Sequence, residues 1–384
     1  MRILIAPDSF KGSMSSVEVS KIMAKGVHEV FPESTTIQVP LSDGGEGLTE
    51  VILHAEGGHK IKVRVHDPLM RPITSFFGLT EDGKTAIIEM SAASGIELLQ
   101  ADELNPLITT TYGTGELIKA ALDQRCRKII IGAGGSATID GGLGLIQALG
   151  GRFLDEKGHE LLSGGGQLNR LAHIDLKWMD KRLDKTKILV ACDVTNPLTG
   201  KEGAAAVYAP QKGASAEMTA ILEKNLQHLA HIISKQFHVE VSDMTYGGAA
   251  GGLATGLVTF LGAKALGGFD LVKKITGLET KIKDADFALT GEGKTDRQTL
   301  FGKAPWSLAR LATRYHVPVI DFTGWYDLSG KKALEKAFTA IIPIHPHPLT
   351  LDEAIRQTED HLLTSVTSVM KLIKTGAFIS LKKS

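Results

Sequence analysis

The sequence predicts an α/β protein with two α/β domains. One is Rossmann-like, with a parallel sheet built from both chain ends, and the other is an inserted mixed α/β domain. Strand-type runs alternate with amphipathic segments near both chain ends, hairpin-spaced runs lie in the middle, and 42 glycines cluster rather than scatter. The expected domains are residues 1–70 with 284–384, and residues 71–283.

The first domain opens with a strand, a helix and a second strand. Residues 2–7 are a short apolar run, and the Ser15 to Glu18 segment is a capping box that predicts a helix to about Phe31. Residues 36–40 predict the second strand, and the glycine-rich segment 43–47 follows it directly. This order is typical of a doubly wound sheet.

The pattern changes near residue 60, where hairpin-length spacing replaces crossover helices. The strands expected in the middle of the chain are 60–65, 73–80, 85–90, 127–131 and 188–191. The helices expected there are 114–124, 215–237 and a tightly packed one within 247–262. The βα alternation resumes near residue 286, with strands at 287–290, 317–322 and 338–342 and helices at 306–315 and 351–375.

Composition excludes several classes of protein. Lys plus Arg equals Asp plus Glu, so no long-range field favours nucleic acid or an anionic membrane. Aromatic residues make up only 5%, which argues against base-stacking platforms. The N-terminal apolar run is too short for a signal peptide, and the uncharged segment 246–263 is broken by glycines. We therefore expect a soluble cytoplasmic protein with Cys126 and Cys192 as reduced core thiols; a homodimer is left open.

Two glycine-rich segments match the sequence patterns of nucleotide-binding motifs. Residues 78–85 satisfy the P-loop pattern, but strand-type runs flank Asp82-Gly83, which predicts a hairpin turn instead. Residues 132–137 follow a strand and fit G-x-G-x-x-A, with Asp155 at the distance of a ribose-binding acid. This second segment is a phosphate-binding loop, a dinucleotide loop or a tight turn without a ligand.

Three polar segments follow three predicted parallel strands, at the edge where open α/β sheets bind ligands. Residues 8–13 place Lys11 among small polar residues, which suits a carboxylate or phosphate. Asp43 and Glu46 suit a hydrated Mg²⁺ or a sugar-like hydroxyl, and residues 290–298 add glycines, Lys294 and Asp296. Helix capping is the alternative explanation for the first two segments taken singly.

Further polar positions lie in the middle of the chain. Asp193 and Asn196 follow a strand and suit a metal or a substrate hydroxyl, or else an Asx-turn before Pro197. Residues 112–115 form a helix-start turn that also suits phosphate, whereas residues 345–348 are a poor metal site because their prolines make a rigid loop. Together these features predict phosphoryl transfer between a nucleotide and a small polar acceptor.

The full set of motifs resembles the bacterial type I glycerate kinases over essentially the whole chain. The matching segments are 6–13, 43–47, 134–142, 192–198, 247–252 and 290–298. The resemblance implies two α/β domains with an active-site cleft between them, and ATP-dependent phosphorylation of D-glycerate, usually at the 2-hydroxyl to give 2-phosphoglycerate. Leu48 and Lys294 depart from the family pattern, as do Trp306 and residues 345–348, and the lysine lacks the bidentate fork of arginine.

The predicted site combines the motifs with these expected substrates, ATP and glycerate, and with Mg²⁺. The predicted catalytic residues are Lys11, Asp193 and Asp296. The predicted substrate-binding residues are Asp8, Ser9, Lys11, Asn196, Glu292 and Lys294, and the predicted metal ligands are Asp43, Glu46 and Asp193. The predicted nucleotide-binding residues are Gly113, Thr114, Gly134, Gly135, Ser136, Gly291 and Gly293. The alternatives are 3-phosphoglycerate as product, an NAD(P)-dependent hydroxy-acid oxidoreductase, and a metabolite sensor without catalysis.

Overall fold

The computed structural model describes residues 1–383, apart from the side chains of residues 298, 301, 329 and 377–383. The chain divides into two compact units. The first comprises Met1–Asp43, Glu50–Ala55 and Phe269–Ser384, and the second comprises Gly44–Thr49 and Glu56–Gly268.

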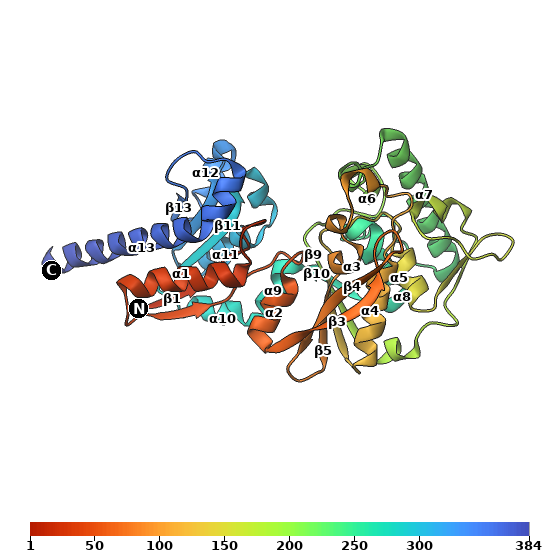
Figure 1. The fold of residues 1–384 in the computed structure, drawn as a ribbon, viewed down its shortest axis with the longest axis horizontal. Helices are drawn as coiled ribbons and strands as arrows, with labels where there is room; N and C mark the ends of the chain where they lie inside the picture. Colours follow the sequence, from red (N-terminus) through yellow and green to blue (C-terminus); the bar gives the residue numbers. More distant parts are fainter. Residues whose placement is uncertain (384) are drawn as a thin grey trace. The chain divides into compact units, whose positions relative to one another are not determined.

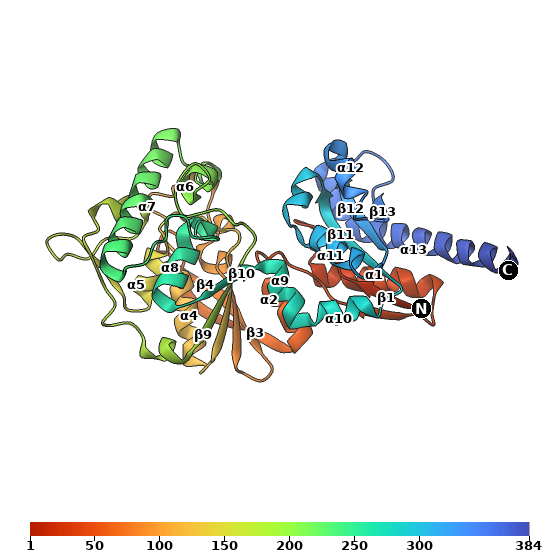
Figure 2. The same ribbon diagram turned by 180° about the vertical axis from the view of Figure 1, so that it is seen from behind.

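A five-stranded parallel sheet forms the centre of the first unit. Its strands, in spatial order, are β13 (Ala340–Pro343), β12 (Val319–Tyr326), β11 (Phe287–Thr295), β1 (Arg2–Ile5) and β2 (Thr35–Gln38). The two chain ends therefore share one sheet, as predicted, and Figures 1 and 2 show the red N-terminal strands beside the blue C-terminal ones. The order reverses between β1 and β11, so this is the topological switch point, where doubly wound sheets bind ligands.

Helices cover both faces of this sheet. The helices α1 (Ser16–Val30) and α13 (Leu351–Lys383) pack together over an apolar core that includes Ile3, Ile5 and Phe322. The capping box at Ser15 is present, as predicted. The helix α11 (Ala304–Thr313) contacts β11 and β12 but contributes nothing to that core, so it covers the other face. The remaining helices of this unit are α9 (Gly268–Thr276), α10 (Leu278–Lys283) and α12 (Lys331–Leu334), and α2 (Leu48–Glu56) crosses between units.

The polar segment that follows Thr290 is strand, not loop, which corrects the sequence prediction. β11 and β12 stay paired as far as Thr295 and Tyr326, beyond the expected ends at residues 290 and 322. Gly291 permits this extension, because a Cβ atom there would lie 2.5 Å from the Phe322 carbonyl oxygen. The extension therefore holds the polar side chains of residues 291–295 on a rigid, hydrogen-bonded strand.

The second unit contains a six-stranded mixed sheet. Its order is β10 (Lys264–Gly267), β9 (Lys187–Cys192), β6 (Lys128–Gly132), β5 (Thr85–Glu89), β4 (Pro72–Thr80) and β3 (Gly58–His66), with β3 and β4 antiparallel. β7 (Arg152–Leu154) and β8 (His173–Asp175) form a separate pair. The turn between β4 and β5 holds Gly83 at φ 68°, which confirms that residues 78–85 form a hairpin and not a P-loop.

Helices pack on this second sheet and bury its core. They are α3 (Ser91–Ser94), α4 (Tyr112–Asp123), α5 (Leu143–Ala148), α6 (Ala204–Tyr208), α7 (Ala216–Phe237) and α8 (Leu253–Leu261). Cys126 and Cys192 belong to this core as free thiols.

The limits of the two units differ from the predicted ones in three places. Residues 44–49, which carry Glu46, belong to the second unit. β3 belongs to the second unit, because it pairs with β4 along its whole length. Residues 269–283, which include α10, belong to the first unit.

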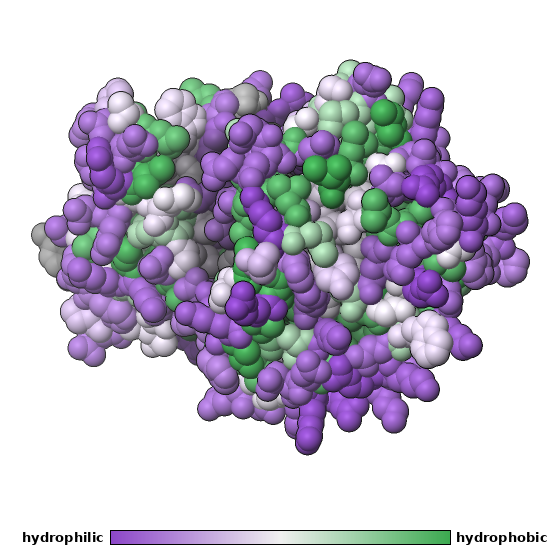
Figure 3. All heavy atoms as spheres, turned by 45° about the vertical axis from the view of Figure 1, so that its right-hand side comes forward, coloured by the Kyte–Doolittle hydropathy of each residue, from purple (hydrophilic) through white to green (hydrophobic). Residues whose placement is uncertain are grey.

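Among the described residues, no helix is both long and apolar enough to cross a membrane. On the face drawn in Figure 3, hydrophilic residues cover most of the surface, and apolar residues form separate patches between them.

Candidate functional site

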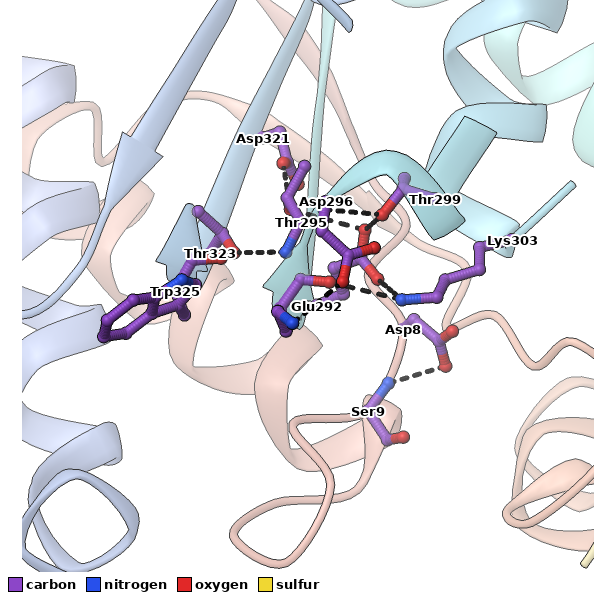
Figure 4. A network of polar contacts seen from close by, with 11 residues as sticks. Asp8, Ser9, Glu292, Thr295, Asp296, Thr299, Lys303, Asp321, Thr323 and Trp325 are labelled. Atoms are coloured by element: carbon purple, nitrogen blue, oxygen red, sulfur yellow. Dashed lines mark hydrogen bonds and ion pairs between the residues drawn. The ribbon is translucent and has the colours of Figure 1, made fainter. Parts of the chain in front are cut away.

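A cluster of carboxyl groups lies at the switch point of the first sheet. Asp8 follows β1, and its backbone N–H donates to the Gly291 carbonyl of β11 at 2.8 Å. The Asp8 carboxyl accepts a hydrogen bond from the Ser9 backbone N–H at 2.7 Å (Figure 4). Burial, together with repulsion from Asp43 and Glu292, raises the pKa of Asp8 to about 8. Negative charge is therefore crowded at this point.

Glu292 is the hub of the cluster. Its carboxyl is buried on β11 and accepts hydrogen bonds from the hydroxyls of Thr299 at 2.8 Å and Thr295 at 3.3 Å. Its other oxygen pairs with Lys303 Nζ at 2.9 Å, as drawn in Figure 4. Burial raises the pKa of Glu292, although Lys303 and the two threonines act in the opposite direction.

Asp321 on β12 forms the inner part of the cluster. It is fully buried, and its Oδ2 accepts a hydrogen bond from Thr295 Oγ1 at 2.8 Å. Its Oδ1 has no hydrogen-bond partner among the residues that the structure describes. Burial and the neighbouring Glu292 raise the pKa of Asp321 to about 8, so this carboxyl carries a proton at neutral pH.

Positive side chains line the same edge of the sheet. Lys294 is largely exposed and pairs with Asp296 at 3.0 Å, and Lys303 immediately precedes α11. The first unit thus supplies nine predicted site residues: Asp8, Ser9, Lys11, Asp43, Gly291, Glu292, Gly293, Lys294 and Asp296.

Sequence analysis missed Lys303, Asp321 and the threonines between them. A signal existed for two of these residues. Asp321 interrupts an otherwise apolar strand, and Lys303 stands between Gly302 and the Ala304-Pro305 helix start. The threonines carried no such signal, since their partner Glu292 was expected in a loop.

The predicted glycine loop of the second unit follows β6. A Cβ atom at Gly134 would lie 2.5 Å from the Gly45 Cα, so Gly134 is where the segment that carries Glu46 packs on the loop. Glu89 holds the same segment by accepting from the backbone N–H groups of Gly47 at 3.1 Å and Thr49 at 2.8 Å.

A buried lysine, Lys212, stabilises this glycine loop through hydrogen bonds. Lys212 Nζ donates to Ser136 Oγ at 2.7 Å and to the Thr138 carbonyl at 2.8 Å. Burial lowers the pKa of Lys212 to about 7, although Asp140 nearby acts in the opposite direction. Asp140 is itself buried, and four of its hydrogen bonds come from Thr111, Gly142 and Gly144.

Contacts within the second unit explain the positions of three other predicted site residues, Gly113, Thr114 and Asn196. A Cβ atom at Gly113 would lie 1.9 Å from the His66 carbonyl, and the Thr114 hydroxyl is buried against Ser94 Oγ at 2.8 Å. The Asn196 amide donates to the Glu202 carbonyl and accepts from the Tyr208 hydroxyl. Asp193 is exposed after β9.

The dinucleotide interpretation of residues 132–137 does not fit the structure. A dinucleotide loop leads directly into a helix, but α5 begins only at Leu143. Asp155 lies in a turn, where it accepts from the backbone of Lys157 and His159 and pairs with Arg170 at 2.9 Å. It is therefore a turn residue, which removes the basis for the oxidoreductase alternative.

The described part of the chain contains no group of three or more His, Cys, Asp or Glu side chains arranged to hold a metal ion. The three histidines 345, 347 and 361 lie near one another, with 2.9 Å between the Nδ1 atoms of His345 and His361. That contact is a hydrogen bond between imidazoles.

Comparison with known proteins gives a consistent result. The model of the glycerate kinase family matches residues 3–374. The chain is 44% identical to the glycerate kinase of Bacillus subtilis (strain 168) over 98% of this chain and 99% of that protein. It is 43% identical to the glycerate 2-kinase of Escherichia coli (strain K12), with the same coverage. A crystal structure from Salmonella typhimurium LT2, of a protein assigned as glycerate kinase 2, superposes with a TM-score of 0.88 at 43% identity, covering 98% of this chain and 99% of the other.

Proposed function

This chain belongs to the glycerate kinase family, and from that premise we propose that it transfers the γ-phosphoryl group of ATP to D-glycerate. We further propose that the acceptor is the 2-hydroxyl, so that the product is 2-phosphoglycerate. The observation that carries this regiochemistry is the near full-length similarity to a relative named glycerate 2-kinase.

The switch point of the first sheet has the groups that phosphoryl transfer needs. The reaction depends mainly on positioning and on meeting the charge of the phosphoryl oxygens. Lys11, in the loop after β1, and Lys303, which pairs with Glu292 of the extended β11, are the cations for this purpose. Lys294 is a further cation at the same edge, tied to Asp296.

A carboxylate receives the proton of the acceptor hydroxyl in this proposal. We assign this role to Asp8, because it follows β1 at the switch point of the sheet, three residues before Lys11. Asp193 and Asp296, predicted from the sequence, are the alternatives. Single asparagine substitutions separate the three, since only loss of the true proton acceptor removes the corresponding limb of the pH–rate profile.

Mg²⁺ is the expected companion of ATP. It usually keeps several waters and binds through one or two carboxylates plus the phosphates, so no cage of three protein ligands is required. The repulsion between Asp8 and Asp43 marks a place where a cation is favourable. Asp43, Glu46 and Asp193 remain the proposed ligands, of which one or two would bind the ion directly, and the ion would neutralise the phosphate charge.

The proposed substrates and product are small and water-soluble. We therefore propose a cytoplasmic enzyme without a nucleic-acid or membrane partner, and the homodimer stays a prediction.

The decisive experiment incubates the protein with ATP, Mg²⁺ and D-glycerate and identifies the product by phosphorus NMR. A 2-phosphoglycerate signal supports the proposal, and a 3-phosphoglycerate signal corrects its regiochemistry. No phosphorylated product from a folded, ATP-binding protein excludes glycerate as the acceptor. L-glycerate in a parallel reaction tests the enantiomer.

A further inference from the structure

A pocket of about 610 Å³ opens within the first unit beside the carboxylate cluster. Its lining comes from the loop after β1, from the extended ends of β11 and β12, from residues 343–349 between β13 and α13, and from the first turns of α13. Lys11 and Gly293, both predicted site residues, belong to the lining. The pocket is therefore continuous with the candidate site.

The size and chemistry of the pocket do not suit glycerate. Pockets of about 300–1,000 Å³ enclose molecules far larger than a short hydroxy acid. The lining is mostly apolar, as in Phe10, Leu349 and Ile355, whereas glycerate is a small anion with hydroxyl groups. An apolar and partly aromatic ligand of larger size is the better match.

Trp325 provides a flat aromatic surface in this pocket. Its side chain is 66% exposed at the end of β12, while Thr323 Oγ1 donates to its carbonyl at 2.8 Å and fixes the backbone. Figure 4 shows the indole directed away from the Glu292–Lys303 pair. An exposed tryptophan on a rigid strand is a surface on which a nucleobase stacks.

Gly293 leaves an open passage between the pocket and Lys11. A Cβ atom there would make only ordinary contacts, the nearest at 3.5 Å to the Lys11 backbone nitrogen. Gly293 is also absent from the glycines with positive φ. The fold itself does not require glycine at this position, and the missing side chain leaves room for a ligand to approach the strand closely.

We propose that this pocket, here called the nucleoside pocket, binds the adenine nucleoside of the donor nucleotide. The base stacks on Trp325, and the phosphates pass over Gly293 toward Lys11. The inference rests on the proposed function, because that function makes ATP the phosphoryl donor.

Filling the pocket tests this assignment without any need for turnover. Ala354→Phe places a ring in the lining of the pocket from α13, and Thr364→Phe places the same ring on an exposed position of the same helix, outside the lining. Calorimetric titration measures the Kd of ADP and of inorganic tripolyphosphate, in the absence of glycerate. We expect Ala354→Phe to raise the Kd of ADP at least about tenfold and to leave that of tripolyphosphate unchanged, because only the nucleoside is displaced.

Trp325→Ala gives a second test that does not depend on tolerance of a larger side chain. Its matched control is Trp178→Ala, since Trp178 is 65% exposed but belongs to the other unit. Loss of stacking raises the Kd of ADP about fivefold or more for Trp325→Ala alone. Fluorescence quenching by ADP in the Trp178→Ala protein, and its loss in Trp325→Ala, gives the same answer optically.

The outcomes separate the inference from the proposed function. Tight ADP binding that neither Ala354→Phe nor Trp325→Ala weakens overturns the nucleoside pocket and leaves the kinase proposal intact. Equal weakening of ADP and tripolyphosphate binding also overturns it, because the pocket would then hold phosphate. ADP binding with the expected variant effects, but without glycerate phosphorylation, supports the pocket and overturns only the acceptor.

Discussion

Lys212 Nζ donates to Ser136 Oγ at 2.7 Å, deep in the second unit and beneath the glycine loop that follows β6. The same ammonium group donates to the Thr138 carbonyl, so it joins two points of this loop. Only 2% of Lys212 is exposed, and its pKa falls to about 7 because burial outweighs the attraction of Asp140. The loop thus depends on a lysine whose charge changes near neutral pH.

Lys212→Met should alter how stability depends on pH. The pKa of Lys212 is lowered from 10.5 to about 7 by folding, so the unfolded chain binds more protons between these values and stability rises with pH across this window. The variant lacks this contribution. Between pH 7 and pH 9.5, the unfolding free energy of the unsubstituted protein should rise by on the order of 2 kcal/mol more than that of the variant.

Urea unfolding at the two pH values measures this difference, with the exposed Lys224→Met as control. A parallel pH dependence for the unsubstituted protein and Lys212→Met would mean that Lys212 stays charged in the fold. Lys212→Met should also lower kcat/KM, because Ser136 loses its hydrogen bond from Lys212. Recovery of kcat/KM in Lys212→Arg would show that the positive charge matters and not the shape of the lysine side chain.

The fold was largely predictable because most strands of the two large sheets carry a clear local signal, whereas β7, β8 and β10 were not predicted. Apolar runs and the capping box at Ser15 predicted most elements, and the predicted hairpin at Gly83 excluded a P-loop in advance. The extension of β11 to Thr295 was not predictable, since glycines normally end strands and here they make room for neighbouring groups.

The candidate site was predictable only where it follows a strand end. The rule that parallel strands place their carboxyl ends together correctly grouped Asp8 and Glu292. Lys303 and Asp321 reach the cluster from a helix start and a strand interior, so their roles depend on packing. Lys212 lies between a glutamine and a glycine, which indicates an exposed turn, and nothing local reveals its burial.

Lys11→Ala should lower kcat/KM at least about a hundredfold, equivalent to about 2.7 kcal/mol, because the phosphoryl charge loses a cation. Steady-state kinetics with ATP and D-glycerate measure the effect. Lys25→Ala, an exposed lysine of α1 in the same unit, is the matched control. A loss of tenfold or less would remove Lys11 from the active centre.

Glu292 and Lys303 should behave as a coupled pair in unfolding experiments. Lys303→Met leaves the buried Glu292 carboxylate unpaired and should cost at least about 2 kcal/mol, toward the low end for buried pairs because the lysine side chain is 32% exposed. The double variant Glu292→Gln with Lys303→Met should recover more than half of this loss, since no buried charge remains. Additive losses in the double-mutant cycle would show that the 2.9 Å contact contributes no coupling.

The unsubstituted protein should lose stability as the pH rises, because Asp321 then gives up its proton in the folded state. Asp321→Asn should abolish this loss. Folding raises the pKa of Asp321 from 3.8 to about 8, so the folded state binds more protons between these values and stability falls with pH through this window. Asparagine cannot ionise and keeps an oxygen to accept from Thr295. The unfolding free energy of the variant relative to the unsubstituted protein should therefore rise by on the order of 4 kcal/mol from pH 5 to pH 8. Thermal unfolding across this range measures the trend, and the exposed Asp352→Asn on α13 is the control. A difference that stays constant with pH would show that Asp321 is ionised throughout, with Lys303 as the nearest cation to compensate for it.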